Sequence, residues 1–249
     1  SLGIPYYTHE SDLSPGLATR LNARRAEGIV ISYEETRGRL PPALRAKARL
    51  AGNPIRRAIR RGDRDTGRAW LGVGDGLPVV LFLGGSQGAR QLNELVEAIL
   101  PALGGRAFVA HQAGPGSEPI SEPGYRRFGF ISREMPEVLA AADIVVGRSG
   151  AGTLWECGAL GKPMILIPLQ GSGTRGDQVE NAELFAKAGA AISLSGKGLG
   201  PEALLGEIGG LLDDRNRASA LGAAASRLAG TDAGDLVADL ILGRIGARK

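Results

Sequence analysis

Apolar residues in this chain gather in short runs that alternate with longer amphipathic stretches. Residues 79–83 and 164–168 are apolar runs of strand length, as expected for strands buried on both faces of a sheet. The pattern predicts strands at 4–8, 29–33, 79–83, 107–112, 125–130, 144–146, 164–168 and 190–194, and helices at 16–26, 89–103, 134–142, 153–160, 178–188, 201–213, 217–228 and 232–245. Alternating strands and helices predict an α/β fold with a doubly wound parallel sheet.

A Pro- and Arg-rich segment at residues 39–55 interrupts this alternation. It contains the turn signal Gly52-Asn53-Pro54, so we place a domain junction there and expect domains at 1–52 and 53–249. The first residues resemble a strand already under way, without Met or a preceding cap. We therefore expect the sequence to be a fragment, or to lack its start.

Composition narrows the function classes. Of the 249 residues 43% are hydrophobic, enough for a substantial core, and only 4% are aromatic, which argues against a surface that stacks nucleic-acid bases. Residues 1–68 carry 14 Lys and Arg against 7 Asp and Glu, whereas the remainder carries 16 against 19. A basic first third suits an anionic membrane surface, a phosphorylated ligand or nucleic acid, and it is equally consistent with a solvated face that has no special partner.

Cys157 is the single cysteine, so no intrachain disulfide forms and a reducing compartment is the simplest interpretation. Its apolar surroundings favour a small core residue over a nucleophile. No apolar run in this sequence approaches the ~18 residues of a membrane-spanning helix, and we expect no secretory signal. We expect a soluble protein, at most peripherally attached to a membrane.

Two glycine-bearing loops are the strongest chemical signals. Gly84–Gly88 follows one predicted buried strand and precedes a helix, so its amides and the helix N-terminus can bind an anion, with the Ser86 hydroxyl as a further donor. The spacing matches neither the dinucleotide-binding fingerprint nor the P-loop. Simple turn formation is the alternative interpretation.

The second loop, residues 149–153, leads into a helix whose first turns carry Glu156. Thr153 and Glu156 have the spacing of a capping box, which would satisfy the helix's own amides. Alternatively, the Glu156 carboxylate accepts two hydroxyls of a ribose, a common use of an acidic side chain beside a nucleotide. Sequence alone leaves both open.

Two further polar clusters are candidates. Gln178 and Asn181 share a helix face, and their amides suit sugar hydroxyls, although Asp177 beside them also fits an N-cap. His9 closes the first predicted strand, where open α/β sheets bind ligands, and is a candidate acid or base. A structural role is the alternative for His9 and for His111. No His, Cys, Asp and Glu cluster has metal-ligand spacing, so we expect neither a metal nor a cofactor.

Several motifs in order support a resemblance. HESDLSPGLA, GNPIR, GGSQGAR and RSGAGTLWE followed by GDQVENA are similar to the MurG family, and the match extends from residue 2 to about residue 190. This family comprises bacterial transferases that move N-acetylglucosamine from UDP-N-acetylglucosamine to undecaprenyl-pyrophosphoryl-N-acetylmuramyl pentapeptide. The resemblance implies an inverting reaction at the acceptor's C4 hydroxyl in peptidoglycan biosynthesis.

The resemblance also implies a GT-B fold of two Rossmann-like domains. Residues 1–52 would be the remnant of a truncated N-terminal domain on the acceptor and membrane side. Residues 53–249 would be a nearly complete donor-binding domain whose last helix packs back towards the first. The implied donor contacts are Arg56, Ser86, Ile131, Ala151, Gly152, Thr153, Leu154, Trp155, Glu156 and Gln178. The backbone at Phe130-Ile131 would read the uracil edge, and Glu156 the ribose.

On the acceptor side the resemblance implies Glu10 and Asp12, with His9 as the catalytic candidate, since the family's glycine-rich loop histidine is absent from this sequence. The implied partners are UDP-N-acetylglucosamine, an undecaprenyl-diphosphate-linked acceptor and an anionic membrane surface, without nucleic acid. The implied location is peripheral, on the cytoplasmic face of the inner membrane. Alternatives are another GT-B lipid glycosyltransferase that uses a UDP-sugar, or a non-catalytic UDP-sugar-binding subunit.

Overall fold

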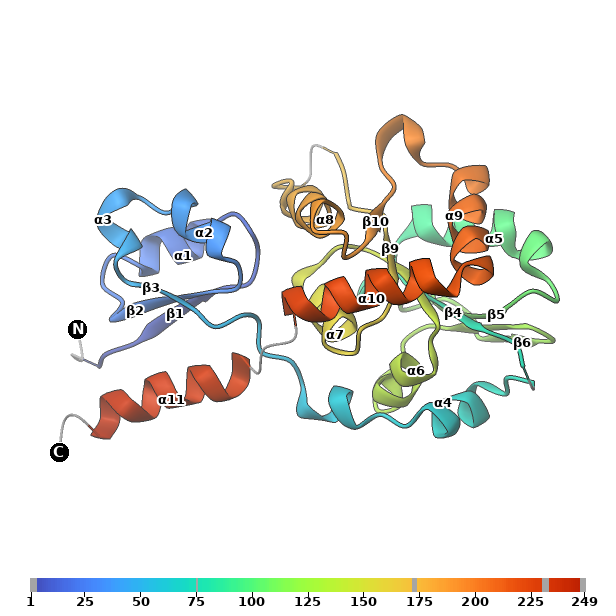
Figure 1. The fold of residues 1–249 in the computed structure, drawn as a ribbon, viewed down its shortest axis with the longest axis horizontal. Helices are drawn as coiled ribbons and strands as arrows, with labels where there is room; N and C mark the ends of the chain where they lie inside the picture. Colours follow the sequence, from blue (N-terminus) through green and yellow to red (C-terminus); the bar gives the residue numbers. More distant parts are fainter. Residues whose placement is uncertain (1–3, 75, 172–173, 230–232, 247–249) are drawn as a thin grey trace. The chain divides into compact units, whose positions relative to one another are not determined.

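The protein consists of two compact units. A computed structural model describes residues 4–74, 76–171, 174–229 and 233–246. One unit comprises the described residues up to Ile55 together with helix α11 (Ala233–Gly246), and the other begins at Arg56 and includes all elements up to helix α10 (Arg215–Ala229) (Figure 1). We describe each unit by itself.

The first unit contains a three-stranded parallel sheet of order β1-β2-β3. Its elements are β1 (Tyr7–Glu10), α1 (Leu17–Asn22), β2 (Gly28–Ile31), α2 (Glu34–Arg39), α3 (Pro42–Arg45) and β3 (Ala48–Leu50). Strand β3 was not predicted: it lies in the Pro- and Arg-rich segment at 39–55, where Ala48 is buried and pairs with Ile29 in the core of this unit. Strand β1 also starts three residues later than predicted.

The second unit contains a seven-stranded sheet of order β10-β9-β8-β4-β5-β7-β6. Its strands are β4 (Val79–Leu83), β5 (Phe108–Gln112), β6 (Ile120–Glu122), β7 (Tyr125–Phe128), β8 (Ile144–Gly147), β9 (Met164–Leu166) and β10 (Ile192–Ser193). The predicted doubly wound parallel sheet is confirmed for six of these strands. The exception is the unpredicted edge strand β6, which runs antiparallel to β7.

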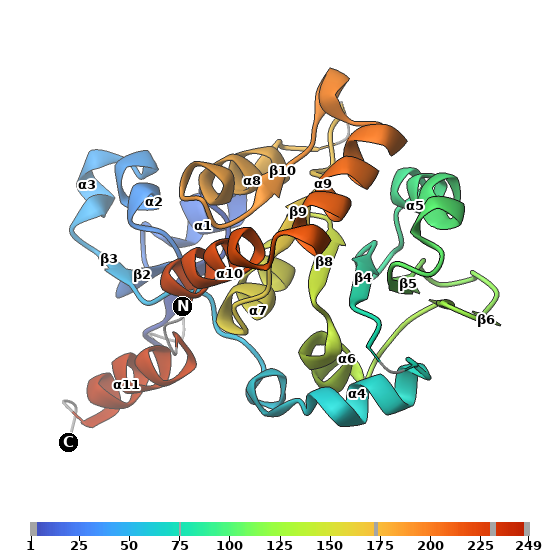
Figure 2. The same cartoon turned by 45° about the vertical axis from the view of Figure 1, so that its right-hand side comes forward.

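Helices cover the sheet of this unit (Figures 1 and 2). Apart from α10 they are η1 (Arg57–Arg61), α4 (Arg64–Leu71), α5 (Arg90–Leu103), α6 (Met135–Ala141), α7 (Ala151–Ala159), α8 (Asp177–Lys187), η2 (Gly196–Gly198) and α9 (Pro201–Asp213). Helices α5 and α9 share a core cluster with the central strands, while α4 packs on α6 and α7 packs on α10. None of the helices within the described ranges has the length and apolar character needed to cross a bilayer.

The strand order reverses direction between β4 and β8. From β4 the chain proceeds outward through β5 and β7, and it then returns to β8 on the other side of β4 and continues to β9 and β10. Such a reversal is a topological switch point, and ligands of open α/β sheets bind there, beyond the carboxyl ends of the strands. Both glycine-bearing loops lie there, because one follows β4 and the other follows β8.

Candidate functional site

A cavity of about 190 Å³ lies at this carboxyl edge. Five parts of the second unit line it: the segment before η1, the end of β4 with the loop that follows, the end of β5, the segment after β7 together with α6, and α7. The lining residues are Arg56, Leu83, Gly85, Ser86, Gln112, Phe130, Ile131, Ser132, Met135, Leu139, Thr153, Glu156 and Cys157. Five of the ten implied donor residues therefore line one cavity: Arg56, Ser86, Ile131, Thr153 and Glu156. They are brought together from positions 100 residues apart in sequence.

The loop after β4 is shaped by backbone contacts. The Gly84 amide donates to the Gln112 carbonyl at 3.2 Å, and the loop turns at Gly88, where φ is +77°. A Cβ on Gly88 would lie 2.4 Å from the Ala113 carbonyl oxygen, so only glycine fits. Helix α5 follows with no side-chain cap at its N-cap Ala89. Its first amides are therefore not satisfied by a cap and suit an anion.

No side chain caps the N-terminus of helix α7 either. It begins at Ala151 after the N-cap Gly150, so Thr153 is its third residue and the capping-box interpretation is wrong. The Glu156 carboxylate instead accepts two hydrogen bonds from Arg56, from Nε at 2.9 Å and from Nη2 at 3.2 Å. The hydrogen bond to Glu156 raises the pKa of Arg56. The Glu156 side chain is 18% exposed and lines the cavity from α7.

The other implied donor residues on α7 differ in whether their backbone or only their buried side chain could matter to a ligand. Ala151 and Gly152 form the first turn, where backbone amides are available to a ligand. The Leu154 and Trp155 side chains are at most 1% exposed and belong to the core. Cys157 is also buried, and desolvation raises its pKa to about 12, which fits the predicted core residue.

Helix α8 places its polar residues outside the cavity lining. Gln178 accepts through Oε1 from the Leu169 amide at 3.0 Å, and its carbonyl accepts from the Ser149 hydroxyl at 2.6 Å. Asn181 is fully buried and donates to the Ser149 carbonyl, so it supports the loop after β8 and is not available to a sugar. The N-cap of α8 is Gly176, which excludes the alternative that Asp177 caps the helix.

The acceptor-side candidates lie in the first unit. His9 is exposed on β1, and its Nε2 lies 3.0 Å from the Gly52 carbonyl, so this nitrogen carries the proton and donates. Glu10 is 5% exposed and accepts from the amides of Asp12 and Gly16, which shapes the loop before α1. The catalytic and acceptor-binding roles of His9, Glu10 and Asp12 stay predictions.

Gln112 is a site residue that sequence reasoning missed. It ends β5, is 4% exposed, and lines the cavity between the two flanking loops. No motif marks it. The available signal was a polar residue closing an otherwise apolar strand next to a glycine loop, at the edge where ligands bind.

His111, beside it, belongs to a buried hydrogen-bond chain. Asn93 donates through Nδ2 to the Ala113 carbonyl, so its Oδ1 accepts from His111 Nε2 at 3.0 Å, and His111 Nδ1 accepts from the Tyr125 hydroxyl at 3.1 Å. Desolvation, helped by the charge of Arg127, lowers the pKa of His111 to about 4. The neutral imidazole therefore supports the loop after β5, which favours the structural alternative for His111.

This imidazole makes the free energy of unfolding depend on pH. The native pKa of about 4 lies below the unfolded value of about 6.5, so the unfolded state binds more protons between these pH values and stability falls as pH falls. We expect a loss of about 3 kcal/mol from pH 7 to below pH 4. Urea unfolding at several pH values measures it. His111→Leu should flatten the slope, and a slope that stays unchanged in this variant contradicts the assignment.

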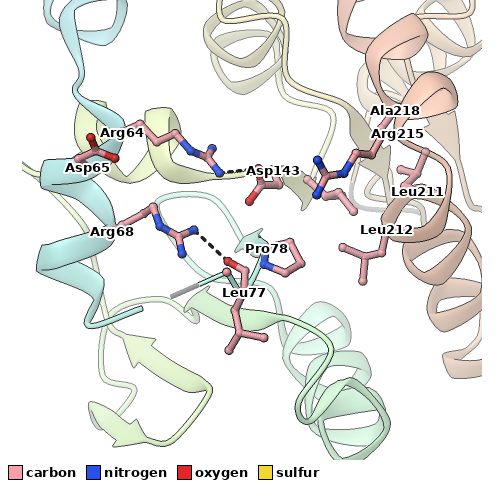
Figure 3. A pocket seen from close by; sticks show the side chains of 12 residues that line it. Arg64, Asp65, Arg68, Leu77, Pro78, Asp143, Leu211, Leu212, Arg215 and Ala218 are labelled. Carbon is pink, nitrogen blue, oxygen red and sulfur yellow. Dashed lines mark hydrogen bonds and ion pairs between the residues drawn. The ribbon is translucent and has the colours of Figure 1, made fainter. Parts of the chain in front are cut away.

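A larger cavity, of about 540 Å³, lies at the opposite, amino-terminal edge of the sheet (Figure 3). Two of its arginines already have partners. Arg64 donates to Asp143 Oδ1 at 2.8 Å, and Asp143 Oδ2 accepts from the Val79 amide at 2.8 Å. Arg68 donates to the Leu77 carbonyl at 2.9 Å. These bonds tie α4 to the starts of β4 and β8, so we assign this cluster a structural role.

The fold and the site together define a Rossmann-type domain with a cavity and two helix starts without side-chain caps at its switch point. Residues 79–237, more than half of the chain, match the sequence profile of the glycosyltransferase family 28 C-terminal domain. The chain belongs to this family.

Individual relatives of this chain support the same family assignment. A protein of Treponema denticola named UDP-N-acetylglucosamine–N-acetylmuramyl-(pentapeptide) pyrophosphoryl-undecaprenol N-acetylglucosamine transferase is 44% identical over 215 residues, which are 81% of this chain and 55% of that protein. The chain thus spans about half the length of this relative. The resemblance to MurG proteins inferred from the motifs is confirmed.

Solved structures show the same architecture. MurG of Acinetobacter baumannii superposes with a TM-score of 0.72 at 24% identity, covering 97% of this chain and 67% of that one. The UDP co-structure of S. aureus MnaA superposes with a TM-score of 0.68 at 11% identity, covering 98% of this chain and 70% of that one. At these identities the likeness concerns the fold, and the expected GT-B class is confirmed.

Proposed function

We propose that this chain contains the donor-binding part of an inverting transferase that moves N-acetylglucosamine from UDP-N-acetylglucosamine to the C4 hydroxyl of undecaprenyl-pyrophosphoryl-N-acetylmuramyl pentapeptide. The observation that carries the proposal is the convergence of Ser86, Ile131 and Glu156 on one cavity at the switch point. The name of the 44% identical Treponema relative supports the choice of donor and acceptor.

The chemistry of the lining suits each part of the donor. Ser86 and the amides that begin α5 and α7 suit the diphosphate, because helix N-termini carry partial positive charge. The Glu156 carboxylate has lone pairs beyond the two that Arg56 uses, and these suit the ribose hydroxyls. The cavity of about 190 Å³ holds part of a nucleotide, so the remainder of the donor would lie over the glycine loops.

The proposed reaction is a direct displacement at the anomeric carbon. A base takes the proton of the acceptor hydroxyl while its oxygen attacks, and the α-linked sugar phosphate becomes a β-linked glycoside. The departing UDP gains negative charge, which the fixed amides at the starts of α5 and α7 stabilise. His9 is our candidate base in the first unit. Its Nδ1 is the acceptor nitrogen of the neutral ring, since Nε2 donates to Gly52.

Calorimetry tests this proposal. We expect the chain to bind UDP and UDP-N-acetylglucosamine and to bind ADP at least tenfold more weakly, because a pocket shaped for a pyrimidine excludes a purine. Equal affinity for UDP and ADP would contradict the choice of base, and absence of UDP binding would overturn the proposal.

We further propose that the first unit docks on an anionic membrane surface. Leu17 and Leu21 lie one turn apart on α1 and are 70% and 61% exposed. Arg20 and Arg24, exposed beside them, line a groove together with Arg39 and Arg45. Exposed leucines flanked by arginines are typical of a peripheral attachment that combines apolar insertion with charge attraction. This supports a peripheral position at the cytoplasmic leaflet, where the lipid-linked acceptor would be held.

Vesicle co-sedimentation checks the docking surface. We expect binding to phosphatidylglycerol vesicles, little binding to phosphatidylcholine vesicles, and a several-fold loss between 0.1 M and 1 M salt, because the arginines act through screened charge. Leu17→Ser with Leu21→Ser should weaken binding, whereas Leu169→Ser, at an exposed leucine of the second unit, should not. Salt-independent binding, or equal binding to both lipids, would contradict the proposal.

A further inference from the structure

One buried side chain joins the two loops that flank the end of β5. Gln112 accepts through Oε1 from the Ile131 amide at 2.9 Å and donates through Nε2 to the Gly85 carbonyl at 3.3 Å. Strand β5 lies between β4 and β7 in the sheet, so its last side chain reaches the loop after each neighbour. The Gln112 residue is 4% exposed, and both its carboxamide oxygen and its carboxamide nitrogen take part in this link.

The two linked loops have different chemistry. The loop after β4 presents Gly85 and Ser86 at the start of α5, where an anion fits. The segment after β7 presents backbone at Phe130 and Ile131, which lines the same cavity. Under the proposed function, one loop holds the diphosphate and the other holds the base. The inference below rests on that function.

We propose that Gln112 is a positioning residue that sets the distance and orientation between the diphosphate-binding loop and the base-binding segment. A nucleotide gains from binding both of its ends at once only if the two subsites are held at the correct separation. The Gln112 carboxamide provides this constraint from a rigid strand end. Backbone bonds tie each loop separately to the end of β5 and the residues after it: the Gly84 amide donates to the Gln112 carbonyl, and the Gly114 amide donates to the Gly129 carbonyl.

Two variants remove either the donor end of the carboxamide alone or both of its ends. Gln112→Glu keeps an oxygen that accepts from the Ile131 amide, but it loses the donor to Gly85 and places a negative charge against that carbonyl. Gln112→Met has similar length and provides neither bond. A surface amide, Asn216 on α10, offers the matched control Asn216→Ala.

The test compares the affinities of uridine, UDP and inorganic pyrophosphate by NMR titration of the whole chain. With Gln112→Glu we expect UDP to bind at least tenfold more weakly while uridine and inorganic pyrophosphate each change by less than twofold. A tenfold loss for pyrophosphate as well would assign the effect to the new negative charge and overturn the inference. With Gln112→Met we expect uridine and UDP both to bind more weakly, and Asn216→Ala should bind both as the unmodified chain does.

The outcomes separate a positioning role from a general structural one. If Gln112→Glu lowers the affinities for uridine and UDP by the same factor, or changes neither, the inference is overturned while the proposed function stands. Melting temperatures of the variants give the cost in stability, and a purely structural role would move these without changing the ratio of the two affinities. If the unmodified chain binds no UDP, the proposed function and this inference both fail.

Discussion

Replacing Glu156 by alanine should weaken UDP binding by about 1–3 kcal/mol, or roughly 5- to 150-fold. The carboxylate is 18% exposed at the cavity mouth, and its loss removes the acceptor proposed for the ribose hydroxyls. The fold should tolerate the change, because the partner Arg56 is 57% exposed and water can solvate it. Calorimetry measures the affinity, and thermal unfolding measures the stability.

Two further variants serve as controls for Glu156→Ala. Glu94→Ala removes a 64% exposed carboxylate on α5, outside the cavity lining, and should leave the affinity unchanged. Glu156→Gln retains one acceptor oxygen and should give an intermediate loss. UDP affinity that survives Glu156→Ala would mean that this carboxylate serves only to hold Arg56.

Replacing Gly88 by alanine should destabilise the second unit by about 2–4 kcal/mol and abolish UDP binding. The residue combines a φ of +77° with a backbone contact that leaves no room for a methyl group, since a Cβ would lie 2.4 Å from the Ala113 oxygen. Backbone must move to accommodate it, and the loop before α5 loses the shape that directs its amides. Urea unfolding and calorimetry measure the two effects.

Gly85 supplies the comparison within the same loop. Its φ is +82°, but nothing lies within 4 Å of the position that a methyl group would take, so Gly85→Ala should cost only the conformational strain of about 1 kcal/mol. If the two alanine variants were equally stable, close backbone packing at Gly88 would not be the reason for the glycine.

Much of the second unit followed from the sequence. The apolar run at 79–83 coincides with β4, and helix α9 has the predicted bounds, because buried strands and long amphipathic helices have strong periodic patterns. Helix α4 was missed because Gly67 and several charged residues obscure its pattern. Its stability depends on the Asp63 side chain, which caps the Thr66 amide, and on close contact of Gly67 with Glu137 of α6.

The sequence predicted only part of the candidate site, because some of its contacts join residues that are far apart in the chain. Motifs located Ser86, Thr153 and Glu156, and all three line the cavity. The Arg56–Glu156 pair joins residues 100 positions apart, and the Gln112 link depends on β5 lying between β4 and β7. The first depends on long-range packing of α7 and the second on strand order, and local spacing in the sequence contains neither. Asn181 was predicted to suit sugar hydroxyls, but its side chain is buried and its amide donates to the Ser149 carbonyl.

The most direct test of the account is a crystal structure of the chain with UDP. We predict that the diphosphate lies against Ser86 and the first amides of α5 and α7, with the ribose hydroxyls on Glu156 and the uracil beside Ile131. UDP bound at the amino-terminal edge of the sheet near Arg64 and Arg68, or no UDP at a concentration that saturates binding in solution, would contradict the central claim.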